Sequence, residues 1–253
     1  MRKSIIVFIL SFPWFVMGVN AQQQPLYSQY VFNGVVINPA HISMESEYSN
    51  ITLMKRQQWV GIPGAPKTTT LSVSMPINAT KTSIGLLAVQ DKAGVNTQTQ
   101  ANLLVAQRIT LAENAYLAVG ASAGINVLKE EDLLLGAPND PLFNKNLTST
   151  SGDIGFGLTF FTDRLFVGLS APSFRKLSLK NNAYDIAGVS HYYLSSGYLF
   201  DLTPMLKFKP TLLIKKIGEG SIQGEATANF LLNNIIWVGL GWRQAESIIG
   251  ITQ

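Results

Sequence analysis

The chain has 253 residues, of which 47% are hydrophobic and only 13% are charged, and it contains no cysteine. This composition excludes a disordered chain and a disulfide-stabilised fold, so stability must come from burial and backbone pairing. The formal net charge of +4 is small for this length, and the Lys and Arg residues are scattered, which argues against a nucleic-acid-binding protein.

The N-terminus differs in character from the rest of the chain. Arg2 and Lys3 precede an apolar run, Ile5–Val16, and small residues follow it. This pattern predicts a signal peptide over residues 1–21 and hence export. A membrane anchor is the weaker alternative, because the run is short and is broken by Pro13. Later in the chain no stretch approaches about 18 consecutive apolar residues, which argues against helical membrane spans.

Beyond Asn50 the sequence alternates polar and apolar residues with period two, and no segment keeps a helical period. Strands of this length are long for a globular domain but suit a tilted bilayer crossing. The clearest case is 115–127, where one face carries Leu117, Val119, Ala121, Ala123, Ile125 and Val127. The pattern predicts about twelve strands, at 49–57, 67–75, 81–90, 97–109, 115–127, 153–162, 164–171, 189–200, 205–215, 222–231, 234–242 and 246–253.

The links between these strands alternate in length. Short links follow every second strand, whereas 128–152 and 172–188 are long. This arrangement is typical of outer-membrane barrels, in which every backbone group must find a partner within a closed sheet. The predicted fold class is therefore all-β, an antiparallel transmembrane β-barrel. Polar strand faces line its lumen and apolar faces meet lipid. The expected domains are a periplasmic or plug segment at 22–48 and the barrel at 49–253.

Aromatic residues near the strand ends fit the interfacial girdles of such a barrel. A β-sandwich core is the alternative interpretation of these side chains. The candidates for the girdles are Trp59, Tyr116, Phe160, Phe161, Tyr192, Tyr193, Tyr198, Trp237 and Trp242.

The sequence gives no support for an enzyme, a cofactor or a metal site. His41 and His191 lack the convergent acidic or cysteine partners that a metal requires. The acidic run Glu130–Asp132 lacks the spacing of a calcium loop and is interpreted as a solvated loop. The glycines of "GFG" (Gly155–Gly157) and "GLG" (Gly239–Gly241) lie inside strands, where they allow a neighbouring side chain or a plug to approach the wall.

Three stretches carry a family resemblance. "QYVFNGVVINPA" (Gln29–Ala40) and "RQQWVGIPGAPKTTTLSVSMP" (Arg56–Pro76) resemble the N-terminal signature of the PorP/SprF family. "DIGFGLTFFTDRLFVGLSAP" (Asp153–Pro172) is similar to the central strand pair of that family. The resemblance runs from about Gln24 to the end of the chain. It marks as structural or partner-docking residues Gln29, Tyr30, Phe32, Asn33, Asn38, Pro39, Ala40, Arg56, Gln58, Trp59, Gly61, Gly64, Ala65, Pro66, Lys67 and Thr68.

Within the second stretch, Gly61–Pro66 predicts a tight first hairpin, because glycine and proline favour turns. Trp59 is placed to anchor at a membrane interface, with Arg56 and Lys67 flanking the hairpin.

The resemblance implies an outer-membrane component of the type IX secretion system and of the gliding machinery that depends on it. Such a protein assists the secretion or surface attachment of cargo such as adhesins, by binding and positioning. The implied partners are the periplasmic ring-forming lipoprotein complex and the C-terminal domain of the cargo. The alternatives are a general porin or nutrient-uptake barrel, and a secreted all-β adhesin. A porin needs lumen charges, for which the candidates are Arg108, Lys207, Lys209, Lys215 and Glu225.

Family members are expected to continue for several more strands, whereas this sequence stops at "SIIGITQ". The expectation is a barrel that is incomplete at its C-terminal end, with an unpaired edge near Ile248–Thr252.

Overall fold

The fold is seen in a computed structural model, which describes residues 30, 32–44, 48–77, 79–130, 147–178, 190–218, 220–244 and 247–252. In these ranges no helix is long and apolar enough to cross a membrane. Two 3-10 helices, η2 (Gly34–Val36) and η3 (Pro39–Ser43), precede the strands. The strands are β1 (Asn50–Gln57), β2 (Lys67–Ile77), β3 (Thr82–Ala93), β4 (Asn96–Ala112), β5 (Ala115–Glu130), β6 (Leu147–Thr162), β7 (Leu165–Ser178), β8 (His191–Tyr198), β9 (Phe200–Thr203), β10 (Leu206–Ile217), β11 (Ile222–Leu232), β12 (Ile236–Arg243) and β13 (Ser247–Thr252).

All of these strands join one antiparallel sheet, in which neighbours in sequence are neighbours in space. The twelve predicted strands are confirmed, with one difference: the segment expected at 189–200 is divided into β8 and β9, both paired with β10. The strands beside the long links extend further than predicted, since β5 ends at Glu130 and β7 at Ser178. The alternation weakens at these ends, so the sequence pattern stops before the backbone pairing does.

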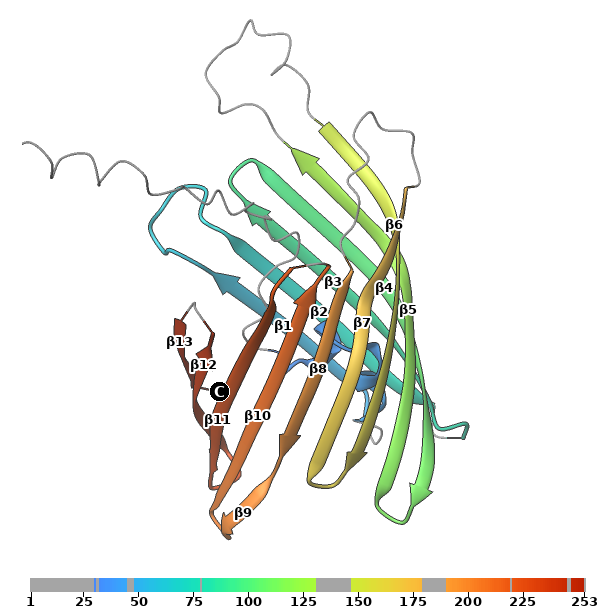
Figure 1. Cartoon of the computed structure of the whole chain (residues 1–253), viewed down its shortest axis with the longest axis vertical. Helices are drawn as coiled ribbons and strands as arrows, with labels where there is room; N and C mark the ends of the chain where they lie inside the picture. The colour runs from blue at the N-terminus through green and yellow to red at the C-terminus, as the bar shows by residue number, and fades with distance from the viewer. Residues whose placement is uncertain are drawn as a thin grey trace, which may run out of the picture.

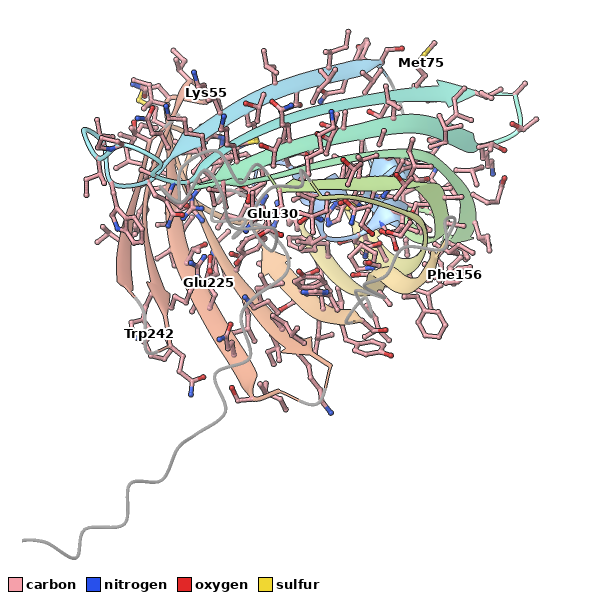
Figure 2. The ribbon with its side chains drawn as sticks, turned by 90° about the horizontal axis from the view of Figure 1, so that it is seen from above. Lys55, Met75, Glu130, Phe156, Glu225 and Trp242 are labelled. Atoms are coloured by element: carbon pink, nitrogen blue, oxygen red, sulfur yellow. The ribbon has the colours of Figure 1, made fainter. Side chains whose placement is uncertain are left out.

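The sheet curls around an inner space, and its two faces differ in chemistry (Figures 1 and 2). On β5, Val119 and Ile125 are exposed on the outer face, whereas the side chain of Ala118 is fully buried on the inner face. Seen from above, Met75 and Phe156 point outward and Glu225 points inward (Figure 2). The predicted division into an apolar outer face and a polar inner face is therefore confirmed.

Four of the aromatic residues expected in interfacial girdles lie on the inner face instead. Tyr116 stands opposite Phe161 and stacks on it, and Trp237 shares its face of β12 with the buried Arg243. Phe161 and Tyr193 are only 6% and 5% exposed and pack on the inner face. Their neighbours Phe160 and Tyr192 take the outer positions, because successive side chains on a strand point to opposite faces. A position near a strand end was therefore insufficient to assign an aromatic residue to a girdle, since the face also matters.

The sheet is not closed. Within the described ranges β1 pairs with β2 alone, and β13 pairs with β12 alone. This arrangement confirms the prediction of an incomplete barrel with an unpaired edge near Ile248–Thr252.

Candidate functional site

A short segment of the chain lies inside the curled sheet. We call residues Asn33–Met44 the docked segment; its helix η3 contacts strands β2 to β6 (Figure 1). Ile37, Ala40 and Ile42 are each at most 1% exposed, so the segment is held by burial. Its helix begins at "NPA", where the Ala40 N–H donates to Asn38 Oδ1 at 2.9 Å and proline takes the first helical position.

Asn38 also fixes the docked segment to the wall. Its side-chain amide donates to the Leu158 carbonyl at 3.1 Å and is 3.0 Å from Thr159 Oγ1. Next to it, Ser170 Oγ donates to the Ile37 carbonyl at 2.6 Å. Both Asn38 and Thr159 are buried, so each of these polar groups would be costly to leave unpaired. The amide of Asn38 thus serves as both a helix cap and a wall anchor.

Three strand glycines form the niche that receives this anchor. A Cβ atom at Gly120 would lie 2.6 Å from Ala40 Cα, and one at Gly168 would lie 2.9 Å from Asn38 Nδ2. At Gly157 a Cβ would collide with Asn38 Oδ1. Any larger residue would therefore push the docked segment away from β5, β6 or β7. We call Gly120, Gly157 and Gly168 the glycine niche.

Tyr30 precedes the docked segment and meets the opposite part of the wall. Its hydroxyl lies 3.3 Å from Thr211 Oγ1, which in turn lies 2.7 Å from Thr227 Oγ1. Burial raises the pKa of the Tyr30 hydroxyl, so it stays neutral and able to donate. On the same face of β11, the Arg243 Nε–H donates to Glu225 Oε2 at 2.6 Å, and both side chains are about 5% exposed. This side of the lumen is thus polar, and its side chains are linked by hydrogen bonds and an ion pair.

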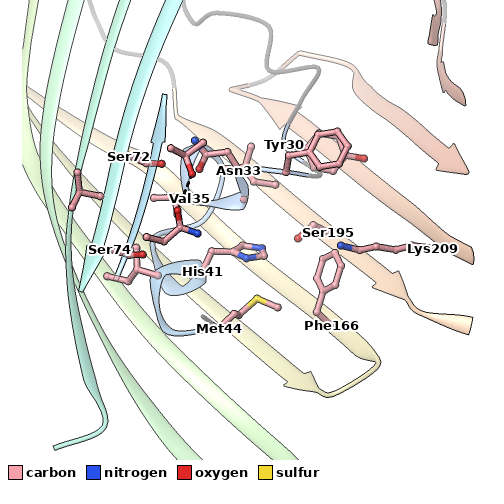
Figure 3. Close-up of a pocket in the computed structure, with 17 residues that line it drawn as sticks. Tyr30, Asn33, Val35, His41, Met44, Ser72, Ser74, Phe166, Ser195 and Lys209 are labelled. Atoms are coloured by element: carbon pink, nitrogen blue, oxygen red, sulfur yellow. Dashed lines mark hydrogen bonds between the residues drawn. The ribbon is translucent and has the colours of Figure 1, made fainter. Parts of the chain in front are cut away.

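A cavity of about 240 Å³ is lined by the docked segment and by residues of β1, β2, β7, β8 and β10 (Figure 3). His41 points into it from η3 and makes an edge contact with Phe166, with ring centroids 5.7 Å apart. Lys209 Nζ lies 5.7 Å from the centre of the same Phe166 ring. Burial, and secondarily the charge of Lys209, lower the pKa of His41 to about 4. At neutral pH the cavity therefore holds one lysine cation and a neutral imidazole.

Acidification is expected to weaken the fold through His41. The ordinary pKa of 6.5 applies when the chain is unfolded, so between pH 6.5 and about 4 the unfolded chain binds a proton that the folded chain does not. Stability should therefore fall as the pH drops through this window. Urea unfolding in detergent can be measured at pH 7.5 and at pH 5.0. Between these pH values the free energy of unfolding of the wild type should fall by about 1 kcal/mol more than that of His41→Gln. An equal fall in the free energy of unfolding for both proteins would show that His41 does not cause this pH dependence.

The first part of the second signature stretch, residues 56–68, lies away from the docked segment, at the far end of β1 and β2. Residues 58–66 form a loop there, so the predicted tight hairpin at Gly61–Pro66 is part of a longer connection. The Gln58 N–H donates to the Pro66 carbonyl at 3.0 Å, which closes the loop. Trp59 is 66% exposed and has a φ of +45°, in the left-handed region that the tight backbone path requires.

The remaining signature residues also lie at different places on the sheet. Phe32 and Asn33 line the cavity with the docked segment, whereas Gln29 lies outside the described residues. Arg56 is half-buried and points to the inner face, while Lys67 is exposed on the outer face. Thr68 points inward and donates to Asp91 Oδ1 at 2.6 Å. Ala65 is buried. The marked residues of the second stretch therefore lie apart from the docked segment, whereas Ser72 and Ser74 of the same stretch line the cavity beside it.

Sequence reasoning anticipated part of the glycine niche. It assigned Gly157 to close approach by a neighbouring side chain or a plug, and Asn38 of the docked segment fills that place. It missed Gly120, Gly168 and Ser170. The two missed glycines could have been found in the sequence, because they occupy positions that point to the inner face of their strands. His41 lies on η3. Among the described residues no group of three His, Asp or Glu side chains is arranged to hold a metal ion.

A comparison with known protein families gives a match over most of the chain. The model of a protein family described as "Type IX secretion system membrane protein PorP/SprF" matches residues 19–253. A search of curated proteins found no match to the chain. The family match spans the docked segment, the glycine niche and every strand.

Proposed function

Since the chain belongs to the PorP/SprF family of type IX secretion system membrane proteins, we propose that it acts in the outer membrane to assist the secretion or surface attachment of cargo such as adhesins. The family match over residues 19–253 is the observation that carries this proposal. Export by a signal peptide at residues 1–21 forms part of it. The protein works by binding and positioning, without bond-making chemistry.

The inner face of the sheet supports a positioning role over free diffusion through an open channel. The docked segment occupies this face, and its Asn38 is 1% exposed. A general porin instead needs a water-filled lumen with accessible charged rings. The charged pair Glu225 and Arg243 is buried and mutually bonded, which removes both groups from such a ring. We accordingly assign residues 22–48 to a plug segment that includes the docked segment.

The proposal includes two partners, which would contact different parts of the barrel. The periplasmic ring-forming lipoprotein complex of the secretion system would contact the short-turn end of the sheet, where β4 meets β5 and β6 meets β7. The C-terminal domain of the cargo would be held by the barrel during passage to the surface. Residues of the loop 58–66 are candidates for docking, because Trp59, Val60 and Ile62 are all exposed there.

Deletion of the full-length gene in its native host tests the proposal. Quantitative proteomics of the cell surface and the medium should show loss of one or a few large cargo proteins, with their accumulation in the periplasm. Complementation with the wild-type gene should restore them. Loss of every type IX substrate would assign the protein to the core machinery instead. Unchanged export of all substrates, together with a large single-channel conductance in planar bilayers, would favour the porin alternative.

A further inference from the structure

The apolar band on the outer face of the sheet ends near the loop 58–66. Along the outer face of β2 the residues run Val73, Leu71, Thr69 and Lys67, from apolar through polar to charged. The outer face of β3 follows the same order and finishes at Lys92. An apolar band bounded by lysines marks the level at which the hydrocarbon of a membrane gives way to headgroups.

Four lysines gather at this boundary, and we call them the lysine row: Lys55, Lys67, Lys92 and Lys129. Strand register places Lys67 directly opposite Lys92. Thr97 of β4 lies opposite both Lys92 and Lys129, so the row continues onto β5. Lys55 lies on β1 and points away from the lumen (Figure 2). All four side chains are exposed.

Among the described residues of β1 to β5, no acidic side chain shares the face of the lysine row. The acidic residues of β1 to β5 are Asp91 and Glu130, and each follows or precedes a lysine, so each points to the inner face. Asp91 accepts a hydrogen bond there from the buried Thr68. Like charges directly opposite each other on one face of a sheet destabilise it. An anion from outside these strands would remove the repulsion between Lys67 and Lys92.

We propose that the lysine row binds the phosphate groups of membrane lipid headgroups. The row is continuous with the lipid-facing band, so any anion that reaches it from the membrane is a lipid phosphate. Trp59 and Val60, 66% and 80% exposed at the same end of the sheet, add an aromatic and an aliphatic side chain of the kind found at membrane interfaces. This inference concerns the outer wall and does not depend on the role in cargo secretion.

Native mass spectrometry of the full chain in dodecyl maltoside tests the inference. The protein is titrated with phosphatidic acid and with diacylglycerol of the same acyl chains. We expect retention of phosphatidic acid only, and binding about tenfold weaker for the double variant Lys67→Gln/Lys92→Gln. Salt should weaken the wild-type binding, because the attraction is electrostatic. The variant Lys67→Arg/Lys92→Arg should bind as the wild type does, since it keeps both charges.

Lys216→Gln is the matched control. Lys216 is exposed on the outer face of β10 at the same end of the sheet, but its cross-strand partners are Ile222 and Tyr192, so it belongs to no row. Its loss should leave lipid binding unchanged. Equal retention of phosphatidic acid and diacylglycerol would overturn the proposal. So would a loss of phosphatidic acid binding in Lys216→Gln as large as that in Lys67→Gln/Lys92→Gln. Binding of inorganic phosphate with the same affinity would also overturn it, by making the row a site for free anions.

Discussion

Gly120→Ala is expected to drive the docked segment from the wall. The added Cβ would meet the backbone of Ala40 and lie 2.7 Å from the carbonyl carbon of Pro39. A backbone cannot rotate aside as a flexible side chain can, so the contacts of Asn38 with β6 would be lost together. We expect a loss of about 1–3 kcal/mol in the free energy of unfolding, measured by urea titration in detergent.

A cysteine reporter gives a direct readout of this displacement. The chain has no natural cysteine, and the hydroxyl of the buried Ser43 makes no hydrogen bond within the described residues, so Ser43→Cys is a mild change. A maleimide should label Cys at this position slowly in the wild-type background and rapidly with Gly120→Ala.

The matched control for this variant is Gly224→Ala on β11. There the nearest atom to an added Cβ is the end of the Gln244 side chain, at 3.8 Å. Labelling should stay slow in this background. Slow labelling with Gly120→Ala as well would show that the docked segment does not depend on the glycine niche.

Arg243→Met is expected to be the most destabilising single change on the other side of the lumen. It removes the guanidinium that bonds Glu225, whose side chain is only 5% exposed. A buried carboxylate that loses its cationic partner costs about 3–5 kcal/mol. The free energy of unfolding of Arg243→Met, measured by the same urea titration, should fall by this amount.

The chain offers a matched surface ion pair as the control. Arg164 and Asp201 approach to 2.8 Å, but their side chains are 59% and 43% exposed. Arg164→Met should therefore cost less than about 1 kcal/mol. The double variant Glu225→Gln/Arg243→Met should recover part of the loss, because no uncompensated charge remains. An equal cost for Arg164→Met and Arg243→Met would mean that the inner pair is well hydrated.

The extent of each strand was readable from the sequence where one face is apolar and the other polar. On β11 the set Gln223, Glu225, Thr227 and Asn229 alternates with small or apolar residues, and the strand lies where this alternation predicts it. Where polar residues occupy both faces, as in Leu147–Gly152 at the start of β6, the alternation carries no signal. Pairing with the end of β5 extends the strand there.

The site was only partly predictable for a related reason. The stretch Gln29–Ala40 stood out as a family signature, but nothing in its residues shows where it docks. The amide of Asn38 reaches Thr159 across a sequence separation of 121 residues. Ser170 meets the Ile37 carbonyl across 133 residues. Such contacts depend on the curvature of several strands together, which no local pattern encodes.

By itself the sequence determined where the strands lie and, along the alternating strands, which residues share a face, because a period of two is a local property of extended backbone. Only the tertiary structure decided that Gly120, Gly157 and Gly168 converge on one segment, and that Lys67 stands opposite Lys92. These relations come from strand register and sheet curvature, which are set by all the neighbouring strands at once.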